Sequence, residues 1–278
     1  MIYTITGGTG TFGQAFVNRL LTMDFIEEIR IFSRDEAKQW DMKKELNDPR
    51  LKYYLGDVRD QDSMYKCFAG ADIVFHAAAM KHVWSCEEFP VEALRTNVLG
   101  TDNAVSTAID CEVQRFILLS SDKAVFPVGA MGMTKALAEK VALANSNNGI
   151  TDIIITRFGN IIDSRGNVID AWHKAMNEER ELVLYEGAAT RYFMTTEQAM
   201  DVVVSAVMVG SDGEIVIPDC KAALMIDLLE AYSEKYNYHK MKALGGLTTG
   251  EKLHEWLDED RCSKHADKYT KQELMKMI

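Results

Sequence analysis

Short apolar runs alternate with amphipathic stretches through the first 160 residues, and this alternation limits the possible folds more than any other feature. The amphipathic stretches have helical periodicity and cover Phe12–Met23, Asp35–Leu46 and Val91–Ile109. The apolar runs between them, three to five residues each, are Tyr3–Thr6, Ile29–Phe32, Leu51–Leu55, Ile73–Phe75, Phe116–Leu119 and Ile153–Thr156. This order is typical of βαβ units, so the sequence predicts an α/β fold with a doubly wound parallel sheet, the Rossmann architecture.

The alternation loosens after Arg157. The expected elements there are helices at Asp170–Asn177, Thr196–Val209 and Ile226–Tyr236, and strands at Leu182–Tyr185 and Ile215–Ile217. We therefore expect residues 1–160 to form a nucleotide-binding domain, with residues 190–217 returning to it. Residues 161–189 and 218–278 are expected to form a smaller substrate-binding cap on the carboxyl edge of the sheet.

Composition excludes several classes of protein. A formal net charge of −11 argues against a nucleic-acid partner, which usually requires a basic face. No run approaches the ~20 apolar residues of a membrane span, and the first residues do not resemble a signal peptide, so we expect no membrane association and a cytoplasmic location. The five cysteines are scattered without a CxxC pair, and His76, His82 and His254 lack metal-ligand spacing, so we expect reduced thiols and no metal.

The loop after the first predicted strand reads TGGTGTFG at residues 6–13 and contains the glycine pattern GxxGxxG. Glycines here allow a tight turn, a close approach of the backbone to a pyrophosphate, and close packing of helix on strand. The following helix would direct N–H groups at the phosphates. This context predicts a dinucleotide site that includes Gly7, Thr9, Gly10, Thr11, Phe12 and Gly13.

The end of the second predicted strand bears on the choice between NAD and NADP. NAD-specific sites usually place a carboxylate there, but this chain has Ser33 and Arg34, with Lys38 one helical turn later. A hydroxyl and two cations suit a 2′-phosphate, so we favour NADP. Alternatively, Arg34 and Lys38 are solvated charges that pair with Asp35 and Glu36.

Residues after the third and fourth predicted strands complete the expected cofactor site. Asp57 is placed to accept a hydrogen bond from the adenine amino group, and Val58 to pack on the ring, although an Asp in this position is often only a helix cap. The small side chains of Ala77, Ala78 and Ala79 would let the nicotinamide ribose approach the backbone.

The fifth predicted strand leads into the segment SSDKAVFPVGAMGMTK at residues 120–135. With this segment the chain resembles the extended short-chain dehydrogenase/reductases, and within them the UDP-N-acetylglucosamine 4,6-dehydratases, including the branch that inverts carbon 5 for surface polysaccharides. The similarity continues in HAAAMKHV at 76–83, RTNVLGT at 95–101, RFGNIIDSRGNVI at 157–169, TRYFMTTEQAMD at 190–201 and GEKLHEWL at 250–257.

The chain departs from the wider superfamily in its YxxxK dyad, because Met131 stands where the tyrosine would be. A thioether cannot take a proton from a sugar hydroxyl. The capsule-type inverting dehydratases are similar in having Met there, so the departure narrows the resemblance and leaves the base for the 4-hydroxyl open. The chain also has Leu247–Thr249 where the family often has an arginine.

The resemblance implies a catalytic role for each residue of this segment. The family oxidises sugar carbon 4, eliminates water across carbons 5 and 6, and reduces carbon 6. Asp122 would be the general acid for the 6-hydroxyl, which requires a raised pKa, and Lys123 the carbon 5 base, which requires a lowered one. Ser121 would bind the 4-hydroxyl and Lys135 the nicotinamide ribose. A solvated Asp122–Lys123 pair in a loop is the alternative.

By the same resemblance, NADP would also contact Asn97. The guanidinium groups of Arg165 and Arg191 suit the diphosphate oxygens of a UDP-N-acetylhexosamine. The other expected contacts of this substrate are Asn160, Glu251, Lys81 and Val168. The family also implies a homo-oligomer, either a hexamer or a dimer. Two other functions remain open: a UDP-sugar 4-epimerase, which needs no acid–base pair for elimination, and a non-catalytic NADP-binding regulator, for which Met131 is the only support.

Overall fold

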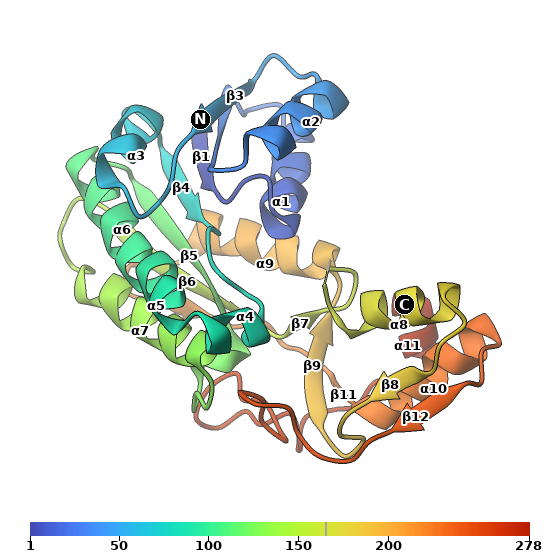
Figure 1. The fold of residues 1–278 in the computed structure, drawn as a ribbon. Helices are drawn as coiled ribbons and strands as arrows, with labels where there is room; N and C mark the ends of the chain where they lie inside the picture. Colours follow the sequence, from blue (N-terminus) through green and yellow to red (C-terminus); the bar gives the residue numbers. More distant parts are fainter. Residues whose placement is uncertain (165) are drawn as a thin grey trace.

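A seven-stranded parallel sheet forms the centre of the larger of two lobes (Figure 1). The computed structural model describes residues 1–164 and 166–278. In spatial order the strands are β10 (Ile215–Val216), β6 (Asp152–Phe158), β5 (Arg115–Ser121), β4 (Ile73–His76), β1 (Ile2–Thr6), β2 (Glu28–Ser33) and β3 (Leu51–Leu55). All neighbouring strands of this sheet pair in parallel. The predicted doubly wound α/β fold is thereby confirmed.

Helices cover both faces of this sheet because the strands are apolar on both sides. On one face, α1 (Thr11–Leu21), α2 (Glu36–Leu46) and α9 (Thr196–Val209) bury residues such as Phe16, Met42 and Val203. On the other face, α3 (Gln61–Phe68), α6 (Gly100–Asp110) and α7 (Ala130–Ala144) bury Met64, Val105 and Ala142.

Strands β1, β2 and β3 are added to the sheet in one direction and β4, β5 and β6 in the other, so the strand order reverses between the parallel neighbours β1 and β4. In doubly wound folds, ligands bind outside the carboxyl ends of the strands at such a switch point. The architecture therefore locates a binding crevice at the ends of β1 and β4.

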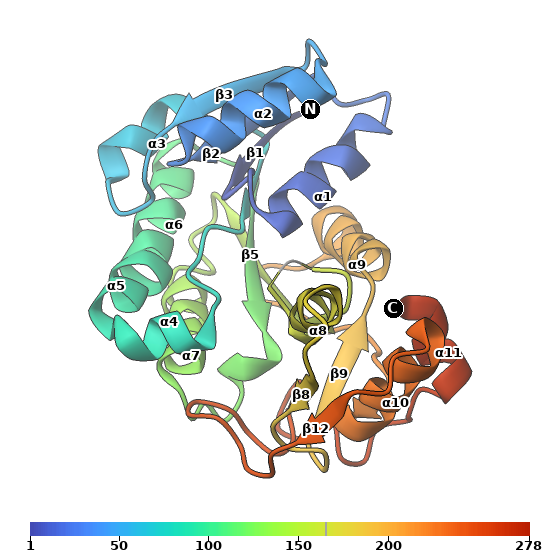
Figure 2. The ribbon, with the colours of Figure 1, turned by 45° about the vertical axis from the view of Figure 1, so that its right-hand side comes forward.

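The smaller lobe has its own apolar core around Trp172, Leu228 and Tyr232. It contains a three-stranded sheet of β11 (Ala222–Leu224), β9 (Thr190–Met194) and β7 (Asn160–Ile161), and a two-stranded sheet of β12 (Met241–Ala243) and β8 (Leu182–Leu184). Figure 2 shows its helices α8 (Val168–Asn177), α10 (Met225–Tyr236) and α11 (Lys271–Met277) around these strands. Within residues 190–217, α9 packs on the large sheet and β10 is its edge strand, whereas β9 pairs with β7 and β11 outside it.

The expected helix Val91–Ile109 is three consecutive segments, namely α5 (Pro90–Leu94), a π-helical turn at Arg95–Leu99, and α6. A further short helix, α4 (Val83–Glu88), precedes them. Single π turns inside helices occur frequently at functional sites. Among the described helices, none is long and apolar enough to span a membrane.

Candidate active site

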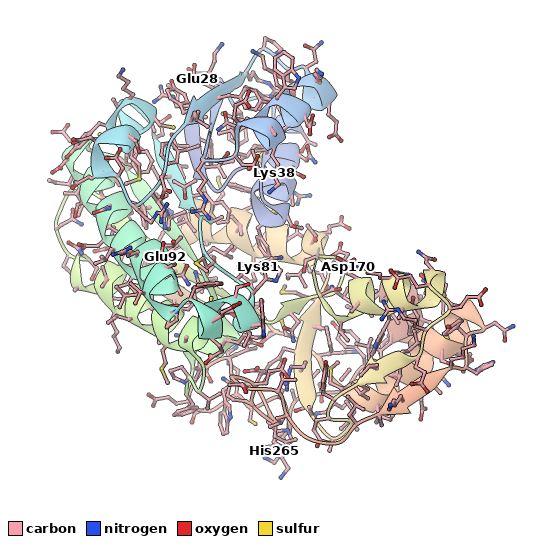
Figure 3. The ribbon with its side chains drawn as sticks, in the orientation of Figure 1. Glu28, Lys38, Lys81, Glu92, Asp170 and His265 are labelled. Carbon is pink, nitrogen blue, oxygen red and sulfur yellow. The ribbon has the colours of Figure 1, made fainter. Side chains whose placement is uncertain are left out.

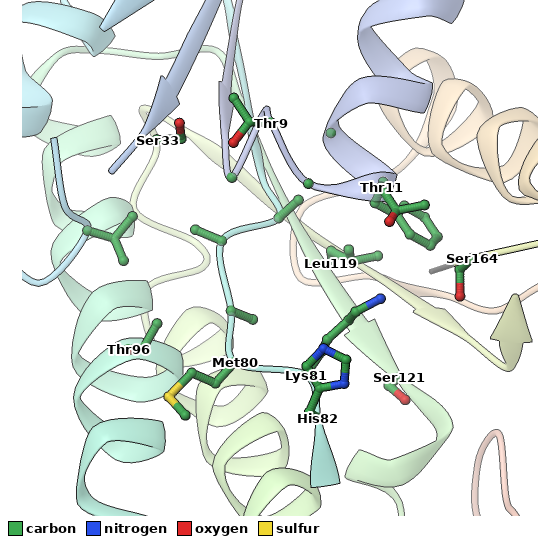
Figure 4. A pocket seen from close by; sticks show the side chains of 18 of the residues that line it. Thr9, Thr11, Ser33, Met80, Lys81, His82, Thr96, Leu119, Ser121 and Ser164 are labelled. Atoms are coloured by element: carbon green, nitrogen blue, oxygen red, sulfur yellow. The ribbon is translucent and has the colours of Figure 1, made fainter. Parts of the chain in front are cut away.

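A cavity of about 680 Å³ opens at the carboxyl ends of β1, β2, β4 and β5, where the topology locates a crevice. Figure 4 shows Thr9 and Thr11 on one side of it, Met80, Lys81 and His82 on another, and Ser121 near its base. The cavity wall includes most residues predicted to bind a cofactor, namely Gly7, Thr9, Gly10, Thr11, Phe12, Gly13, Ser33, Arg34, Lys38, Asp57, Val58, Ala77, Ala78, Ala79 and Lys135.

The glycine loop brings bare backbone to this cavity. Gly7 has φ +66°, and a Cβ on it would lie 2.8 Å from the backbone of Ala78. A Cβ on Gly13 would lie 2.5 Å from the Gly7 carbonyl oxygen, so α1 can pack this closely only with glycine there. Gly10 is the N-cap of α1 and offers no side chain to its first N–H groups. The loop thus fits the phosphates of a dinucleotide.

Both interpretations of the cations after β2 have support in the geometry. The Lys38 ammonium lies 2.8 Å from the Asp35 carboxylate, and the Arg34 guanidinium lies 3.7 Å from that of Asp57. Arg34 and Lys38 both line the cavity, and each side chain is 59% exposed, so both can turn towards a ligand. A hydrogen bond from the Arg59 side chain lowers the pKa of Asp57, which is therefore ionised at the cavity wall.

The wall opposite the glycine loop depends on buried polar contacts. Asn97, in the π turn, accepts a hydrogen bond from the Met80 N–H at 2.7 Å and donates to the Met80 carbonyl at 3.0 Å. Asn97 thus lies behind the wall and holds it, while its neighbour Thr96 lines the cavity. His76 is fully buried between Thr6 and Thr101, and burial lowers its pKa to about 3, so its ring is neutral.

Asp122 and Lys123 form a short 3₁₀ turn (Asp122–Ala124) directly after β5. The Lys123 ammonium donates to Asp122 Oδ1 at 3.3 Å and to Asn160 Oδ1 at 3.1 Å. The Ser121 hydroxyl also donates to Asp122 Oδ1, at 3.0 Å. Asp122 is completely buried, and within the described residues its Oδ2 has no hydrogen-bond partner.

The surroundings shift the two pKa values of this pair in the same direction. Burial raises the pKa of Asp122, although the Lys123 charge opposes this shift. Burial acts to lower the pKa of Lys123, but the carboxylates of Asp122 and Glu255 outweigh it and raise the pKa above its ordinary value. The pKa of Asp122 is raised, as expected, whereas the lowered pKa expected for Lys123 is wrong, because the carboxylates of Asp122 and Glu255 face its ammonium.

Lys135 and Met131 lie in the first turns of α7 and both line the cavity. Burial lowers the pKa of Lys135 to about 8, and its ammonium donates to the Leu119 carbonyl at 2.5 Å. Met131 is 7% exposed and packs with Cys86 and Ala93. The position of the missing tyrosine is therefore filled by an apolar side chain.

A second cavity of about 460 Å³ lies in the smaller lobe. It is lined by three predicted substrate residues, Val168, Arg191 and Glu251, and the Arg191 guanidinium lies 3.8 Å from the Glu251 carboxylate. Two others, Lys81 and Asn160, line the first cavity. Figure 3 shows Lys81 and Asp170 on the two sides of the opening between the lobes. Arg165 lies outside the described residues.

Comparison with known proteins decides the family. A family profile described as "Polysaccharide biosynthesis protein" matches residues 3–277, which is almost the whole chain. The chain belongs to the polysaccharide biosynthesis protein family. The resemblance inferred from the sequence is thus confirmed at this coarser level, and the narrower assignment to the 4,6-dehydratases stays a prediction.

Relatives of this family member differ in name. A protein of Rickettsia felis named UDP-glucose 4-epimerase is 43% identical over 269 residues, which cover 95% of this chain and 79% of that protein. The structure of Pen from Bacillus thuringiensis superposes with a TM-score of 0.94 and 29% identity, covering 99% of this chain and 97% of that one. DesIV from Streptomyces venezuelae, a dTDP-glucose 4,6-dehydratase with NAD and TYD bound, superposes with a TM-score of 0.83. At 21% identity over 100% of this chain and 95% of that one, DesIV shows a shared fold.

The sequence-based prediction of this family member's site missed Glu255 and Lys252. Glu255 is 1% exposed and lies 3.8 Å from the Lys123 ammonium. Lys252 lies 2.8 Å from Glu255 and donates to the Val125 carbonyl. Both residues belong to the segment GEKLHEWL, where the resemblance drew attention only to Glu251. Among the described residues, no group of three or more His, Cys, Asp or Glu side chains is arranged to hold a metal.

Proposed function

We propose that the chain is a UDP-N-acetylhexosamine 4,6-dehydratase that uses a nicotinamide dinucleotide, with NADP as its preferred form, and inverts carbon 5. The observation that carries this proposal is the completely buried Asp122 carboxyl, which lies directly behind the cavity wall and accepts a hydrogen bond from the amine of Lys123, a residue that lines the first cavity. A buried acid next to an amine suits the elimination of water, which needs a proton for the leaving hydroxyl and a base for carbon 5.

The cofactor would lie along the glycine loop, with its adenosine end near Asp57 and Val58 and its nicotinamide end near Lys135. A nicotinamide bound there would supply the hydride acceptor for sugar carbon 4 and the hydride donor for carbon 6. Asn97 would support this site through the backbone of Met80, which it holds.

A single proton transfer prepares the pair for elimination. The Lys123 ammonium already donates to Asp122 at 3.3 Å, so moving this proton leaves a carboxylic acid on Asp122 and a neutral amine on Lys123. Neither the net charge nor the number of bound protons changes, and burial favours the neutral form of the pair. Asp122 then donates to the leaving 6-hydroxyl, and the Lys123 amine takes the proton from carbon 5.

The 4-hydroxyl needs another base, because Met131 replaces the tyrosine. Ser121 would bind this hydroxyl, and a water would relay its proton to Lys135. The pKa of Lys135, lowered by burial to about 8, keeps part of its population deprotonated near neutral pH. The 4-hydroxyl step should therefore become faster as the pH rises towards 8.

The second cavity is our candidate for the uridine diphosphate. Arg191 offers a guanidinium that suits the diphosphate, Glu251 can accept from the ribose hydroxyls, and Val168 adds an apolar contact. Lys81 and Asn160, in the first cavity, would bind the sugar. We keep Arg165 as a further substrate contact on the basis of the sequence resemblance alone.

Product identity tests this function. The protein, NADP⁺ and UDP-N-acetylglucosamine are incubated in D₂O, and the product is analysed by mass spectrometry and NMR. We expect loss of one water, a 4-keto-6-deoxy sugar and deuterium at carbon 5. A product of unchanged mass with inverted carbon 4 would instead support a UDP-sugar 4-epimerase, the second candidate, which the name of the Rickettsia relatives favours. Absence of any turnover would support a dinucleotide-binding regulator.

The cations after β2 should determine cofactor preference. Replacing both Arg34 and Lys38 by alanine should weaken NADP⁺ binding at least about tenfold, ~1.4 kcal/mol, because two charges near the 2′-phosphate are lost. NAD⁺ binding should change much less. Isothermal titration of both cofactors measures this, with the exposed Lys43→Ala of the same helix as control. Equal affinity of the unmodified protein for NAD⁺ and NADP⁺ would contradict the prediction.

We also propose a homo-oligomer, with adjacent faces of α4, α5, the π turn and α7 as its contact. These elements pack against one another, and Figure 1 shows them on one flank of the larger lobe. They expose several large apolar side chains, namely Trp84, Val91, Leu94, Leu99, Met133 and Leu137.

A charge in this surface should dissociate the oligomer. Leu137→Glu should reduce the particle mass measured by light scattering, because an ionised carboxylate cannot be buried without a partner. Val209→Glu introduces the same charge at an exposed position of α9 and serves as the control. A monomeric unmodified protein at assay concentration would contradict this proposal.

A further inference from the structure

Glu255 faces three cations inside the protein. Its Oε1 lies 3.8 Å from the Lys123 ammonium and 4.0 Å from the Arg191 guanidinium, and its Oε2 lies 2.8 Å from the Lys252 ammonium. Only 1% of Glu255 is exposed, so these contacts are shielded from water and salt. A buried carboxylate in such a position has a strong influence on its neighbours.

The backbone holds Glu255 firmly in this place. Its N–H donates to the Ser263 hydroxyl at 2.8 Å, and that hydroxyl lies 2.7 Å from the Thr190 hydroxyl of β9. Lys252, three residues earlier in the chain, donates to the carbonyls of Val125 at 2.6 Å and Asp122 at 3.3 Å. Glu255 and Lys252 therefore contact the side chain and the backbone of the same 3₁₀ turn.

The charges of this cluster give Glu255 a particular role. Around Lys123 the described ionisable neighbours are Asp122 on its own turn, Glu255 and Lys252 on the 250–257 segment, and Arg191 on β9. When Asp122 is protonated, Glu255 is the remaining carboxylate within 4 Å of the Lys123 ammonium among the described residues. Without Glu255, the ammonium groups of Lys123 and Lys252 would have Asp122 as their nearest described carboxylate, and Asp122 itself must become neutral; Arg191 would keep its contact with Glu251 at 3.8 Å.

We propose that Glu255 is a positioning residue that holds the Lys123 amine against Asp122 and sets the pH at which this amine loses its proton. The catalytic consequence rests on the proposed function, whereas the electrostatic contact does not. Glu255 raises the pKa of Lys123 against the effect of burial. In return, although burial opposes it, Lys123 and the other cations lower the pKa of Glu255, which stays ionised.

The consequence is that Glu255 keeps one proton shared between Asp122 and Lys123. With Glu255 present, Lys123 keeps its proton until Asp122 can receive it, so the acid and the base arise together. Without that charge, Lys123 would lose its proton to solvent at a lower pH, and Asp122, whose pKa Glu255 helps to raise, would be protonated less readily.

Glu255→Gln tests the proposal because it removes the charge and preserves the shape. The protein loaded with NADP⁺ is labelled with acetic anhydride over a pH series, and the extent of labelling at Lys123 is read by peptide mass spectrometry. We expect the midpoint of Lys123 labelling to fall by about one pH unit. In turnover, the limb of the pH–rate profile that belongs to the base should move in the same direction by the same amount.

Two further variants make the result interpretable. Glu259→Gln, an exposed position in the same region, applies the same chemical change and should leave the midpoint and the turnover unchanged. Glu255→Asp keeps the negative charge but places it one methylene farther from the Lys123 ammonium. The midpoint of Lys123 labelling should therefore fall by less than in Glu255→Gln. This variant provides the answer if Glu255→Gln does not fold, as judged by circular dichroism.

An unmoved Lys123 midpoint in a folded Glu255→Gln or Glu255→Asp protein would overturn the proposal. Failure of the proposed function looks different: the unmodified protein would release no water from a UDP-N-acetylhexosamine, while the labelling midpoint would still respond to Glu255. The two ideas can therefore fail independently.

Discussion

Lys123→Ala should lower the rate of dehydration by about 10²–10⁴-fold, the usual contribution of a general base. The variant should also stop the exchange of the carbon 5 proton with solvent, because no other described amine donates to both the Asp122 carboxylate and the Asn160 side chain. Proton NMR of the sugar in D₂O measures both effects. The first oxidation at carbon 4 need not be lost, so reduced cofactor should accumulate on the enzyme and absorb near-ultraviolet light.

Two comparisons identify the role of the lysine. Asp122→Asn should block the loss of water while part of the carbon 5 exchange survives, because the acid acts on a different atom. Lys140→Ala, an exposed lysine of α7, should behave like the unmodified protein. Carbon 5 exchange at the normal rate in Lys123→Ala would show that another group is the base.

Gly13→Ala should have the second largest effect, on both cofactor binding and stability. The added Cβ would lie 2.5 Å from the Gly7 carbonyl oxygen and from the Gly8 Cα, which are backbone atoms that cannot rotate away. Either α1 moves away from β1 or the loop opens, and overpacking of this kind costs about 1–3 kcal/mol. Thermal unfolding with and without NADP⁺ should show a lower midpoint and a smaller stabilisation by the cofactor.

Gly187→Ala is the matched control for this change. Its added Cβ would meet Ile226 no closer than 3.5 Å, which is ordinary contact, and Gly187 does not have a positive φ. Its unfolding midpoint and its response to NADP⁺ should stay close to those of the unmodified protein. Equal effects of the two substitutions would mean that the glycine loop has no special need for glycine at position 13.

The large sheet could be predicted because its signals are local. Strands such as Arg115–Ser121 and Asp152–Phe158 are largely buried and contain continuous apolar runs, and the glycines between the first strand and its helix mark the turn. The smaller lobe was predicted less completely. Its central strand β9, TRYFM, is buried throughout but begins with Thr190 and Arg191. Because these two residues are polar, the sequence has no apolar pattern that predicts a buried strand there.

The candidate site divides along the same line. One motif of 14 consecutive residues contains Asp122, Lys123, Met131 and Lys135, so the sequence alone indicates that they belong together. Glu255 was missed because its role depends on a contact with Lys123, which is far away in the sequence. The segment GEKLHEWL contains two carboxylates, Glu251 and Glu255, and its sequence does not indicate which of them is buried. The exposed fraction of a side chain depends on the folded structure.

The return of the 250–257 segment to the 3₁₀ turn has a consequence for the order of folding. The glycine loop and six of the seven strands of the large sheet lie within the first 160 residues, so they form through contacts that are shorter in sequence than the one between Lys123 and Glu255. The acid–base pair acquires its full electrostatic surroundings only after Lys252 and Glu255 dock, and contacts of such separation form slowly. A growing chain can therefore shape its dinucleotide loop early, while its reactive centre is assembled last, when both lobes are in place.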